Sequence, residues 1–259
     1  LTTREEMRNM AYLKTTGIVI KEVNTGEADR IITIFSKDRG KILGFAKGAR
    51  RPQSRLVAGT QLLCYSDFML FKGRDMYYVS SCDIIEPFYD IRNDLERLTY
   101  ASHMNELIGD VVQAEQSATD ILQLFLNSLY MLSKTDKSPL QIVRVFELRL
   151  LSVLGYAPVV NGCISCGNFE FDNMLFSFQD CGFLCGDCAL EGKNTLRISE
   201  GAAKALNYII YSRVNNLFNF EVSLGVLREL GKISERFIRE RLEKNYKKLD
   251  FIKTLNIRT

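Results

Sequence analysis

The chain has no tryptophan, four prolines and one histidine among its 259 residues. The single histidine, His103, leaves little room for a Ser-His-Asp or Cys-His catalytic device, and its place in a helical run is typical of a packed helix residue. Three motifs are also missing: G-x-x-x-x-G-K-[ST], a helix-opening G-x-G-x-x-G, and H-E-x-x-H. Acidic residues are scattered, without a cluster suited to two metal ions. These absences argue against a nuclease.

Long apolar runs and a secretion signal are missing as well. No apolar run approaches the roughly 20 residues of a membrane-spanning helix. The opening stretch LTTREEMRNMAYLK has no apolar h-region and is not a signal peptide. We therefore expect a cytoplasmic protein with no membrane partner. We also expect residues 1–9 to be a leader or tag remnant, with Met10 as the natural start.

The first third of the chain has the pattern of short strands. Runs rich in β-branched and aromatic residues are separated by turn residues, which favours a small closed barrel. The predicted strands cover residues 11–23, 30–36, 41–47, 60–71 and 76–85. Five strands with one long loop and a basic edge are typical of an OB-fold. We expect most of their aromatic residues to fill the barrel and a minority to be available for stacking on bases.

Positive charge is concentrated between Lys37 and Arg55, although the whole chain carries only +3. Seven residues of this stretch are cationic and one, Asp38, is anionic. Gly48 and Pro52 interrupt regular structure here, so the cations lie on a strand end and on a loop that runs to about residue 59. Cations displayed on a folded scaffold suit a polyanion such as nucleic acid, whereas a solvated loop is the simpler interpretation.

After residue 87 the pattern changes to helix. Apolar residues at three- and four-residue spacing predict a series of helices. These cover residues 93–113, 119–133, 140–154, 199–212 and 223–247. The third of them is apolar almost all round, so we expect it to be the buried hub of a helical domain, with Arg144, Glu147 and Arg149 in pairs or at a surface.

The last predicted helix is strongly charged. From Arg228 to Lys248 it carries eight cations and four acids. A second nucleic-acid surface is one interpretation of this pattern. A solvated helix face with ion pairs between residues four apart is the simpler one.

Five of the seven cysteines lie between Cys163 and Cys188. They include two C-x2-C knuckles separated by 18 residues. Clustered thiols without a secretion signal favour a metal over disulfides, and two such knuckles complete a tetrahedron around zinc. We expect Cys163, Cys166, Cys185 and Cys188 to hold a structural Zn²⁺, because four thiolates leave no open position for water.

The zinc would fasten an insert that is too rich in loops to bury a core of its own. Residues 169–178 are the predicted hairpin of a zinc ribbon, and Cys181 is left outside the ligands because its spacing to Cys185 is less suitable. Direct contact of the ribbon with DNA is a second interpretation. A redox role would need a thioredoxin-like βαβ context, which is missing.

Three blocks of sequence carry a family resemblance. GEADRIITIFSKDRGKILGFAKGARRPQSRL (residues 26–56), FELRLLSVLGYAP (146–158) and the closing CGFLCGDC (181–188) resemble RecO, the bacterial recombination-mediator family. The resemblance runs in order along nearly the whole chain from Met10. It agrees with an α+β multidomain architecture: an N-terminal five-stranded OB-fold barrel (10–88), an α-helical domain (89–160 and 193–259) and an inserted four-cysteine zinc module (161–192). Family members usually have glycine at the position of Cys181, which supports its exclusion.

The resemblance implies a mediator of recombinational repair that is not an enzyme. RecO proteins bind single- and double-stranded DNA, anneal complementary strands, engage the acidic C-terminal tail of the single-stranded DNA-binding protein, and act with RecR to load RecA. Such a protein is cytoplasmic and associates with the nucleoid during repair. The basic stretch can screen the repulsion between two DNA strands without reading their sequence. The residues expected to contact DNA are Arg30, Lys41, Lys47, Arg50, Arg51 and Arg55.

Two points stay open in the sequence. The acidic tail needs a basic and apolar pocket in the helical domain, and Arg144 and Arg149 are the candidates for it. A protein-interaction scaffold, with the basic loop docked on an acidic protein, and an RNA-binding OB protein are the alternative functions.

Overall fold

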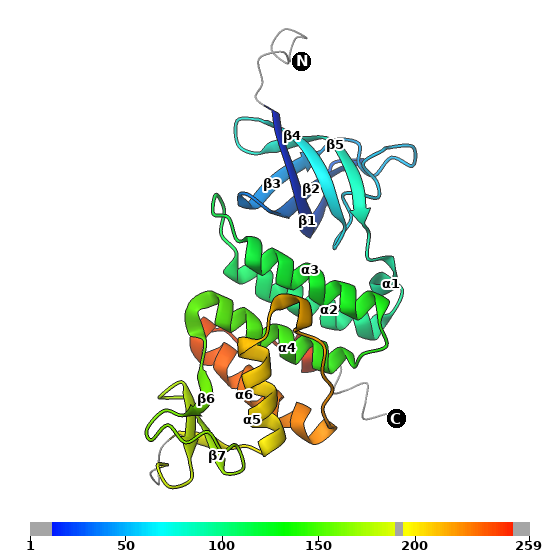
Figure 1. Cartoon of the computed structure of the whole chain (residues 1–259). Helices are drawn as coiled ribbons and strands as arrows, with labels where there is room; N and C mark the ends of the chain where they lie inside the picture. Colours follow the sequence, from blue (N-terminus) through cyan, green and yellow to red (C-terminus); the bar gives the residue numbers. More distant parts are fainter. Residues whose placement is uncertain (1–11, 190–193, 251–259) are drawn as a thin grey trace. The chain divides into compact units, whose positions relative to one another are not determined.

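The computed structural model describes residues 12–189 and 194–250 of the chain (Figure 1). The predicted leader, residues 1–9, lies outside the described residues. The chain divides into two compact units, which are considered separately. The first unit extends to Leu95 and includes Asn105–Gln123, and the second consists of Glu96–Met104 and the chain from Leu124 onward. In the described part of the chain, no helix combines the length and the apolar character needed to cross a membrane.

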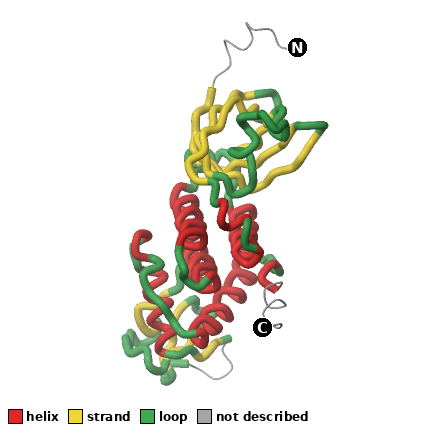
Figure 2. The backbone as a smooth tube through the Cα atoms, turned by 90° about the vertical axis from the view of Figure 1, so that its right-hand side faces the viewer, coloured by secondary structure: helices red, strands yellow, loops and turns green. Residues whose placement is uncertain are grey.

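The first unit contains a closed five-stranded barrel, whose strands are yellow in Figure 2. Its strands are β1 (Tyr12–Thr25), β2 (Asp29–Ser36), β3 (Gly40–Ala46), β4 (Tyr65–Lys72) and β5 (Tyr77–Glu86). They close in the order β1-β2-β3-β5-β4, with all pairs antiparallel except β3 and β5. The predicted barrel is therefore confirmed.

Alternation of buried and outward residues along each strand forms the barrel core, because successive side chains of a strand point to opposite faces. The buried cluster includes Ile32, Ile34, Phe68, Leu70 and Val79. The fourth strand begins five residues later than predicted. Leu63, which is buried and has a φ of 63°, turns the chain and is tied to β1 by a 2.8 Å hydrogen bond from its N–H to the Val19 carbonyl.

Residues 105–123 are joined to the barrel at the start of β3. The Lys41 N–H donates to the Gln113 carbonyl at 3.0 Å, and Asn105 Nδ2 donates to the Ile20 carbonyl at 2.8 Å. Gly40 has a φ of 60°, and a Cβ atom there would lie 2.1 Å from the Gln113 carbonyl oxygen. Only glycine fits this contact, since it has no side chain and adopts positive φ freely.

The helices are α1 (Tyr89–Arg92), α2 (Leu95–Val111), α3 (Thr119–Lys134), α4 (Pro139–Leu151), α5 (Glu200–Tyr211) and α6 (Leu224–Leu242). A π-helical turn, Ser152–Tyr156, follows α4, and a 3-10 turn, Val214–Asn216, follows α5. The hydroxyls of Ser138, Ser199 and Ser223 cap α4, α5 and α6 by accepting from N–H groups of the first turn. The last helix ends five residues earlier than predicted, because Glu243 adopts a left-handed conformation.

Helix α4 is the hub of the second unit, as predicted. It buries ten of its 13 residues and packs against α5 and α6 (Figure 1). A helix that is apolar almost all round has to be covered on every side. Its few polar residues therefore need partners inside the protein.

A four-stranded sheet in the order β6-β8-β7-β9 carries the cysteine module. Its strands are β6 (Val159–Cys163), β7 (Met174–Ser177), β8 (Gly182–Cys185) and β9 (Thr195–Arg197). The hairpin is formed by β7 and β8, so the predicted hairpin at residues 169–178 is placed too early. Residues 169–173 lie in a loop, where Phe169 is 73% exposed.

Candidate nucleic-acid interface and metal centre

The basic loop, residues 47–59, is fixed at its start by hydrogen bonds from two of its backbone N–H groups. The Gly48 N–H donates to Asp29 Oδ1 at 2.6 Å, and the Arg50 N–H donates to the Ala28 carbonyl at 2.9 Å. Turns follow within the loop, from the Arg51 N–H to the Gly48 carbonyl and from the Ser54 N–H to the Arg51 carbonyl. The loop therefore presents its side chains from an ordered backbone.

Four of the six predicted DNA contacts project from this loop. Lys47, Arg50, Arg51 and Arg55 are all exposed, and none forms an ion pair within the described part of the chain. Two of them, Lys47 and Arg51, line an open groove of about 660 Å³ together with Gly48, Pro52, Gln53 and Ser54. Unpaired cations around a groove favour the binding of a phosphate backbone.

Arg30, the fifth predicted contact, is directed inward. Its side chain is 11% exposed, and its guanidinium forms an ion pair with Glu22 at 3.4 Å. The same group donates to Thr60 Oγ1 at 3.1 Å and approaches the Val57 carbonyl at 3.5 Å. Since Val57 and Thr60 lie at the far end of the basic loop, Arg30 anchors that end.

Lys41, the sixth predicted contact, also has an internal partner. Its Nζ donates to the Gly109 carbonyl at 2.5 Å, in the last turn of α2. A cation near a helix C-terminus is stabilised by the carbonyl groups that end there. The structure thus separates the six residues into four outward cations and two that bind the fold itself.

The aromatic residues of the barrel separate in the same way. Phe35 and Phe68 are buried in the core. Phe45, Phe71 and Tyr78 lie on the outer surface. Tyr12 joins this outer group against Phe71, and sequence analysis missed it, although it alternates with Leu13 in the strand pattern.

The four knuckle cysteines come together in the second unit. The Sγ atoms of Cys163, Cys166, Cys185 and Cys188 all lie within 4.8 Å of one another, with Cys166 and Cys185 3.6 Å apart. Four sulfurs around a tetrahedral zinc, with Zn–S bonds near 2.3 Å, are about 3.8 Å apart. The donor set and its spacing are compatible with zinc.

Backbone groups shape the two knuckles. The Cys188 N–H donates to the Cys185 carbonyl at 3.1 Å, and the Gly167 N–H donates to the Cys163 carbonyl at 2.8 Å with a φ of 76° at the glycine. Burial acts to raise the pKa of Cys163, but N–H groups of Cys166, Cys185 and Ser165 directed at its sulfur lower the pKa to about 6. A thiolate is the form that binds metal.

The other three cysteines lie outside this group of sulfurs. Cys181, with a φ of 55°, sits close to Arg241, and burial raises the pKa of its thiol. Cys64 and Cys82 are buried in the barrel, where burial raises the pKa of both thiols, that of Cys82 to about 11. Protonated buried thiols behave as small apolar side chains.

Arg144, a predicted contact for an acidic tail, is not available to one. Its side chain is 6% exposed, and it is paired with Glu147 at 2.8 Å and Glu235 at 2.6 Å. Glu147 also meets His103 Nε2 at 2.7 Å and accepts from Ser234 at 2.6 Å. Burial opposes the ionisation of Glu147, but Arg144, His103 and Ser234 outweigh it and lower its pKa to about 2.

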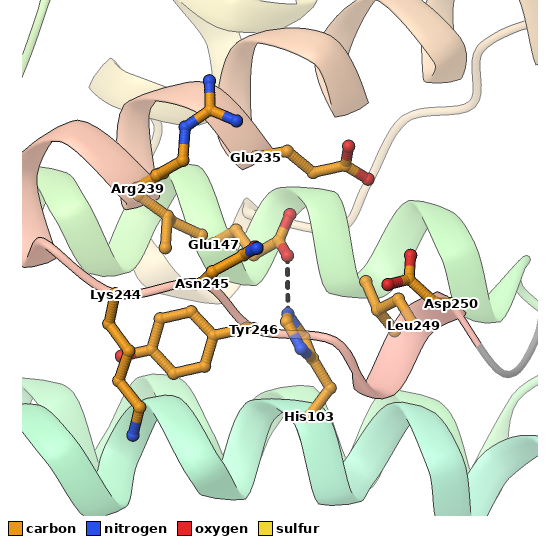
Figure 3. Close-up of a pocket in the computed structure, with 10 residues that line it drawn as sticks. His103, Glu147, Glu235, Arg239, Lys244, Asn245, Tyr246, Leu249 and Asp250 are labelled. Atoms are coloured by element: carbon orange, nitrogen blue, oxygen red, sulfur yellow. Dashed lines mark hydrogen bonds and ion pairs between the residues drawn. The ribbon is translucent and has the colours of Figure 1, made fainter.

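The buried charge cluster, defined here as His103, Arg144, Glu147 and Ser234 with the partly exposed Glu235 at its edge, lies beside a small cavity. Figure 3 shows His103 and Glu147 facing each other in this cavity of about 100 Å³. Arg149, the other candidate for the tail, donates to the carbonyls of Ile209 and Ile210. Both arginines of α4 are thus engaged by the protein itself.

The comparisons with known proteins agree along the chain. The model "Recombination protein O N terminal" matches residues 10–88, and "Recombination protein O C terminal" matches residues 92–250. A DNA repair protein RecO from Acetivibrio thermocellus is 72% identical over 247 residues, which cover 95% of this chain and 98% of that protein. The chain belongs to the RecO family.

Two further RecO relatives are more distant. The DNA repair protein RecO of Caldicellulosiruptor saccharolyticus is 35% identical, and that of Alkaliphilus metalliredigens is 33% identical, each over 244 residues. Both alignments cover 94% of this chain and 99% of the relative. The closed barrel is accordingly the OB-fold of the RecO N-terminal domain. The predicted boundaries of the RecO domains and of the zinc module stay a prediction.

Proposed function

We propose that this chain is a recombination mediator that binds single- and double-stranded DNA through the basic loop of its barrel. The observation that carries the proposal is the set of four exposed cations, Lys47, Arg50, Arg51 and Arg55, on an ordered loop. Contacts to phosphates position a strand without selecting its sequence. The chain should therefore bind DNA of any sequence.

Annealing follows from the same charges. Two complementary strands repel each other, and a loop that neutralises phosphates on both lowers that repulsion. The proposed activity is the pairing of complementary strands, without chemical change in the DNA. The one histidine of the chain supports a role other than catalysis, because it is buried against Glu147 and α4.

The proposed partners come from membership of the RecO family. With RecR, the chain would help RecA to load on DNA coated with the single-stranded DNA-binding protein, whose acidic tail it would engage. The proposed resident metal is a structural Zn²⁺ held by Cys163, Cys166, Cys185 and Cys188. When bound, zinc supplies folding free energy to the module, because four thiolates close its coordination sphere.

Fluorescence anisotropy with a labelled single strand tests the DNA site. Log K should fall linearly with log salt, by about 0.7 for each phosphate contacted. The double variant Arg50→Ala/Arg51→Ala should bind more weakly, with a slope shallower by one to two contacts, roughly 0.7 to 1.4. It should also anneal complementary strands more slowly in a strand-pairing assay.

A charge-matched control is Arg228→Ala/Lys232→Ala on α6, which removes two exposed cations elsewhere. This variant should keep the native slope. If the control loses affinity and the loop variant does not, DNA binds α6 and the proposal for the loop is wrong. A strong preference for RNA of the same sequence would instead indicate the RNA-binding function.

A further inference from the structure

A row of aromatic rings crosses the outer surface of the barrel. Tyr12 and Phe71 are 6.4 Å apart between ring centroids, Phe71 and Tyr78 5.0 Å, and Tyr78 and Phe45 5.6 Å. The strand register explains the row, because Tyr12 pairs with Phe71, Phe71 with Tyr78, and Tyr78 with Phe45. The aromatic row, as these four residues are called below, thus spans β1, β4, β5 and β3.

Two rings of the row are exposed and the other two, Phe45 and Phe71, are partly exposed, unlike the aromatic core. Tyr12 is 53% exposed and Tyr78 38% exposed, whereas Phe35 and Phe68 are buried. Phe71 and Tyr78 are stacked with an angle of 7° between their planes. Tyr12 and Phe45 meet this stacked pair edge-on, at 69° and 67°. Aromatic rings gathered at a surface are what single-strand binders use to stack bases.

The charges around the row match a nucleic acid. Lys14, Lys72 and Arg74 are exposed beside it on β1, at the end of β4 and in the turn before β5. Phe45 lies at the end of β3, and Lys47, the first cation of the basic loop, follows in the turn after the strand. Strand β3 ends at Ala46 and the chain turns there into the groove lined by Lys47 and Arg51, so the row and the groove are neighbours along the chain.

We propose that the aromatic row is the base-stacking platform for single-stranded nucleic acid, with the phosphates of the same strand on the basic loop. This proposal rests on the proposed function and adds the means by which the barrel distinguishes single strands from duplexes. A duplex hides the faces of its bases but still offers phosphates. The loop should therefore bind both forms, whereas the row should strengthen binding only where base faces are free.

The first test compares variants of Tyr78 on three ligands by anisotropy: labelled oligo(dT), an abasic strand of equal length, and a duplex. Tyr78→Ala and Tyr78→Leu should each bind oligo(dT) about tenfold more weakly. Both should keep the native affinity for the abasic strand and the duplex, with unchanged salt slopes. Tyr78→Phe, which keeps the ring, should bind like the native chain.

The matched control is Tyr130→Ala, which removes an exposed tyrosine from α3 (54% exposed). It should bind all three ligands like the native chain. The Leu variant keeps apolar area at position 78, so the comparison of Leu with Phe isolates the aromatic face. Thermal unfolding of each variant checks that the barrel is intact.

A second measurement uses the lack of tryptophan in the chain. Tyr78→Trp places a single indole in the row, and its fluorescence should be quenched by oligo(dT) and unchanged by the abasic strand. Native binding of oligo(dT) by the Leu variant, or equal losses on all three ligands, would overturn the stacking proposal. If Arg50→Ala/Arg51→Ala still weakens binding in that case, the proposed function stands alone. If the native chain binds none of the ligands, both proposals are wrong.

Discussion

The arginines of the basic loop and the arginine at the centre of α4 face opposite environments. Arg50 and Arg51 are exposed and form no ion pair with a described residue, whereas Arg144 is buried between Glu147 and Glu235. An exposed cation stays hydrated until it binds a partner. For a buried cation, acidic partners within the protein offset the cost of desolvation. The same residue type is thus free to meet an outside partner in one unit and is bound inside the protein in the other.

The difference also predicts what each set of polar groups controls. Groups with partners inside the protein, which include the four clustered knuckle cysteines and the buried charge cluster, should determine stability and leave DNA affinity unchanged. Cations turned outward should determine affinity and its dependence on salt, and leave stability unchanged. Four experiments test whether stability and DNA affinity depend on separate groups in this way.

Loss of the metal site should have the largest effect. Structural zinc contributes about 10 kcal/mol or more to the folding of small zinc modules. Cys185→Ser should release zinc and unfold the β6–β9 module, which hydrogen exchange and a colorimetric zinc assay would detect. Cys181→Ser is the control and should retain zinc, as its sulfur lies outside the group of four. Retention of zinc by the first variant would contradict the assignment.

Glu147→Gln should have the next largest effect. The amide cannot balance the charge of Arg144, and breaking a buried ion pair costs about 3 to 5 kcal/mol. Urea unfolding should show this loss, with DNA affinity unchanged. The control, Glu240→Gln, breaks an exposed pair with Arg236 and should change stability by less than about 1 kcal/mol. Equal losses in the two variants would remove the distinction between buried and exposed charge.

Acid should act on the same carboxylate. The pKa of Glu147 is lowered to about 2 in the folded chain, against about 4.3 in an unfolded one. Its contribution to stability is therefore complete well above pH 4.3 and is lost as the pH falls through 2. Between pH 5 and pH 3, the native chain should lose about 1 to 2 kcal/mol more than Glu147→Gln. The free energy of unfolding is measured against pH for both chains, and the difference between the two curves is taken. Release of metal by protons affects both chains and cancels in this difference. Parallel curves would contradict the lowered pKa of Glu147.

Arg30→Ala should have the smallest effect of the four. Its guanidinium anchors Val57 and Thr60, so the variant should lose about 1 kcal/mol of stability from its hydrogen bonds. Its salt slope for DNA should stay native, whereas Arg55→Ala should have a slope shallower by about 0.7. A shallower slope for Arg30→Ala would mean that Arg30 contacts phosphate after all.

Much of the architecture could be predicted from local pattern. Short alternating runs predicted the five strands of the barrel, and the spacing of Cys163, Cys166, Cys185 and Cys188 predicted the group that the structure brings together. Both signals are strong because backbone geometry alone sets the two-residue alternation of side chains along a strand and the distance between the two sulfurs of a C-x2-C knuckle.

The direction of individual charges could not be predicted in this way. Arg30 points inward because Glu22, on the neighbouring strand, and Thr60, 30 residues later, meet it in the folded chain. Arg144 is buried for the same reason, through Glu235 on α6. Composition indicates that a segment is basic, but tertiary partners decide which of its cations remain free.

The contact between the start of β3 and the end of α2 has a consequence for synthesis on the ribosome. Lys41 binds the Gly109 carbonyl, 68 residues further along the chain. The barrel can close once Glu86, the end of β5, is made, and Gly109 follows 23 residues later, roughly 1 to 5 seconds at about 5 to 20 residues per second. The nascent barrel therefore waits with the edge at the start of β3 uncovered until the end of α2 emerges, and a pause in translation over residues 90–110 should prolong its exposure to chaperones.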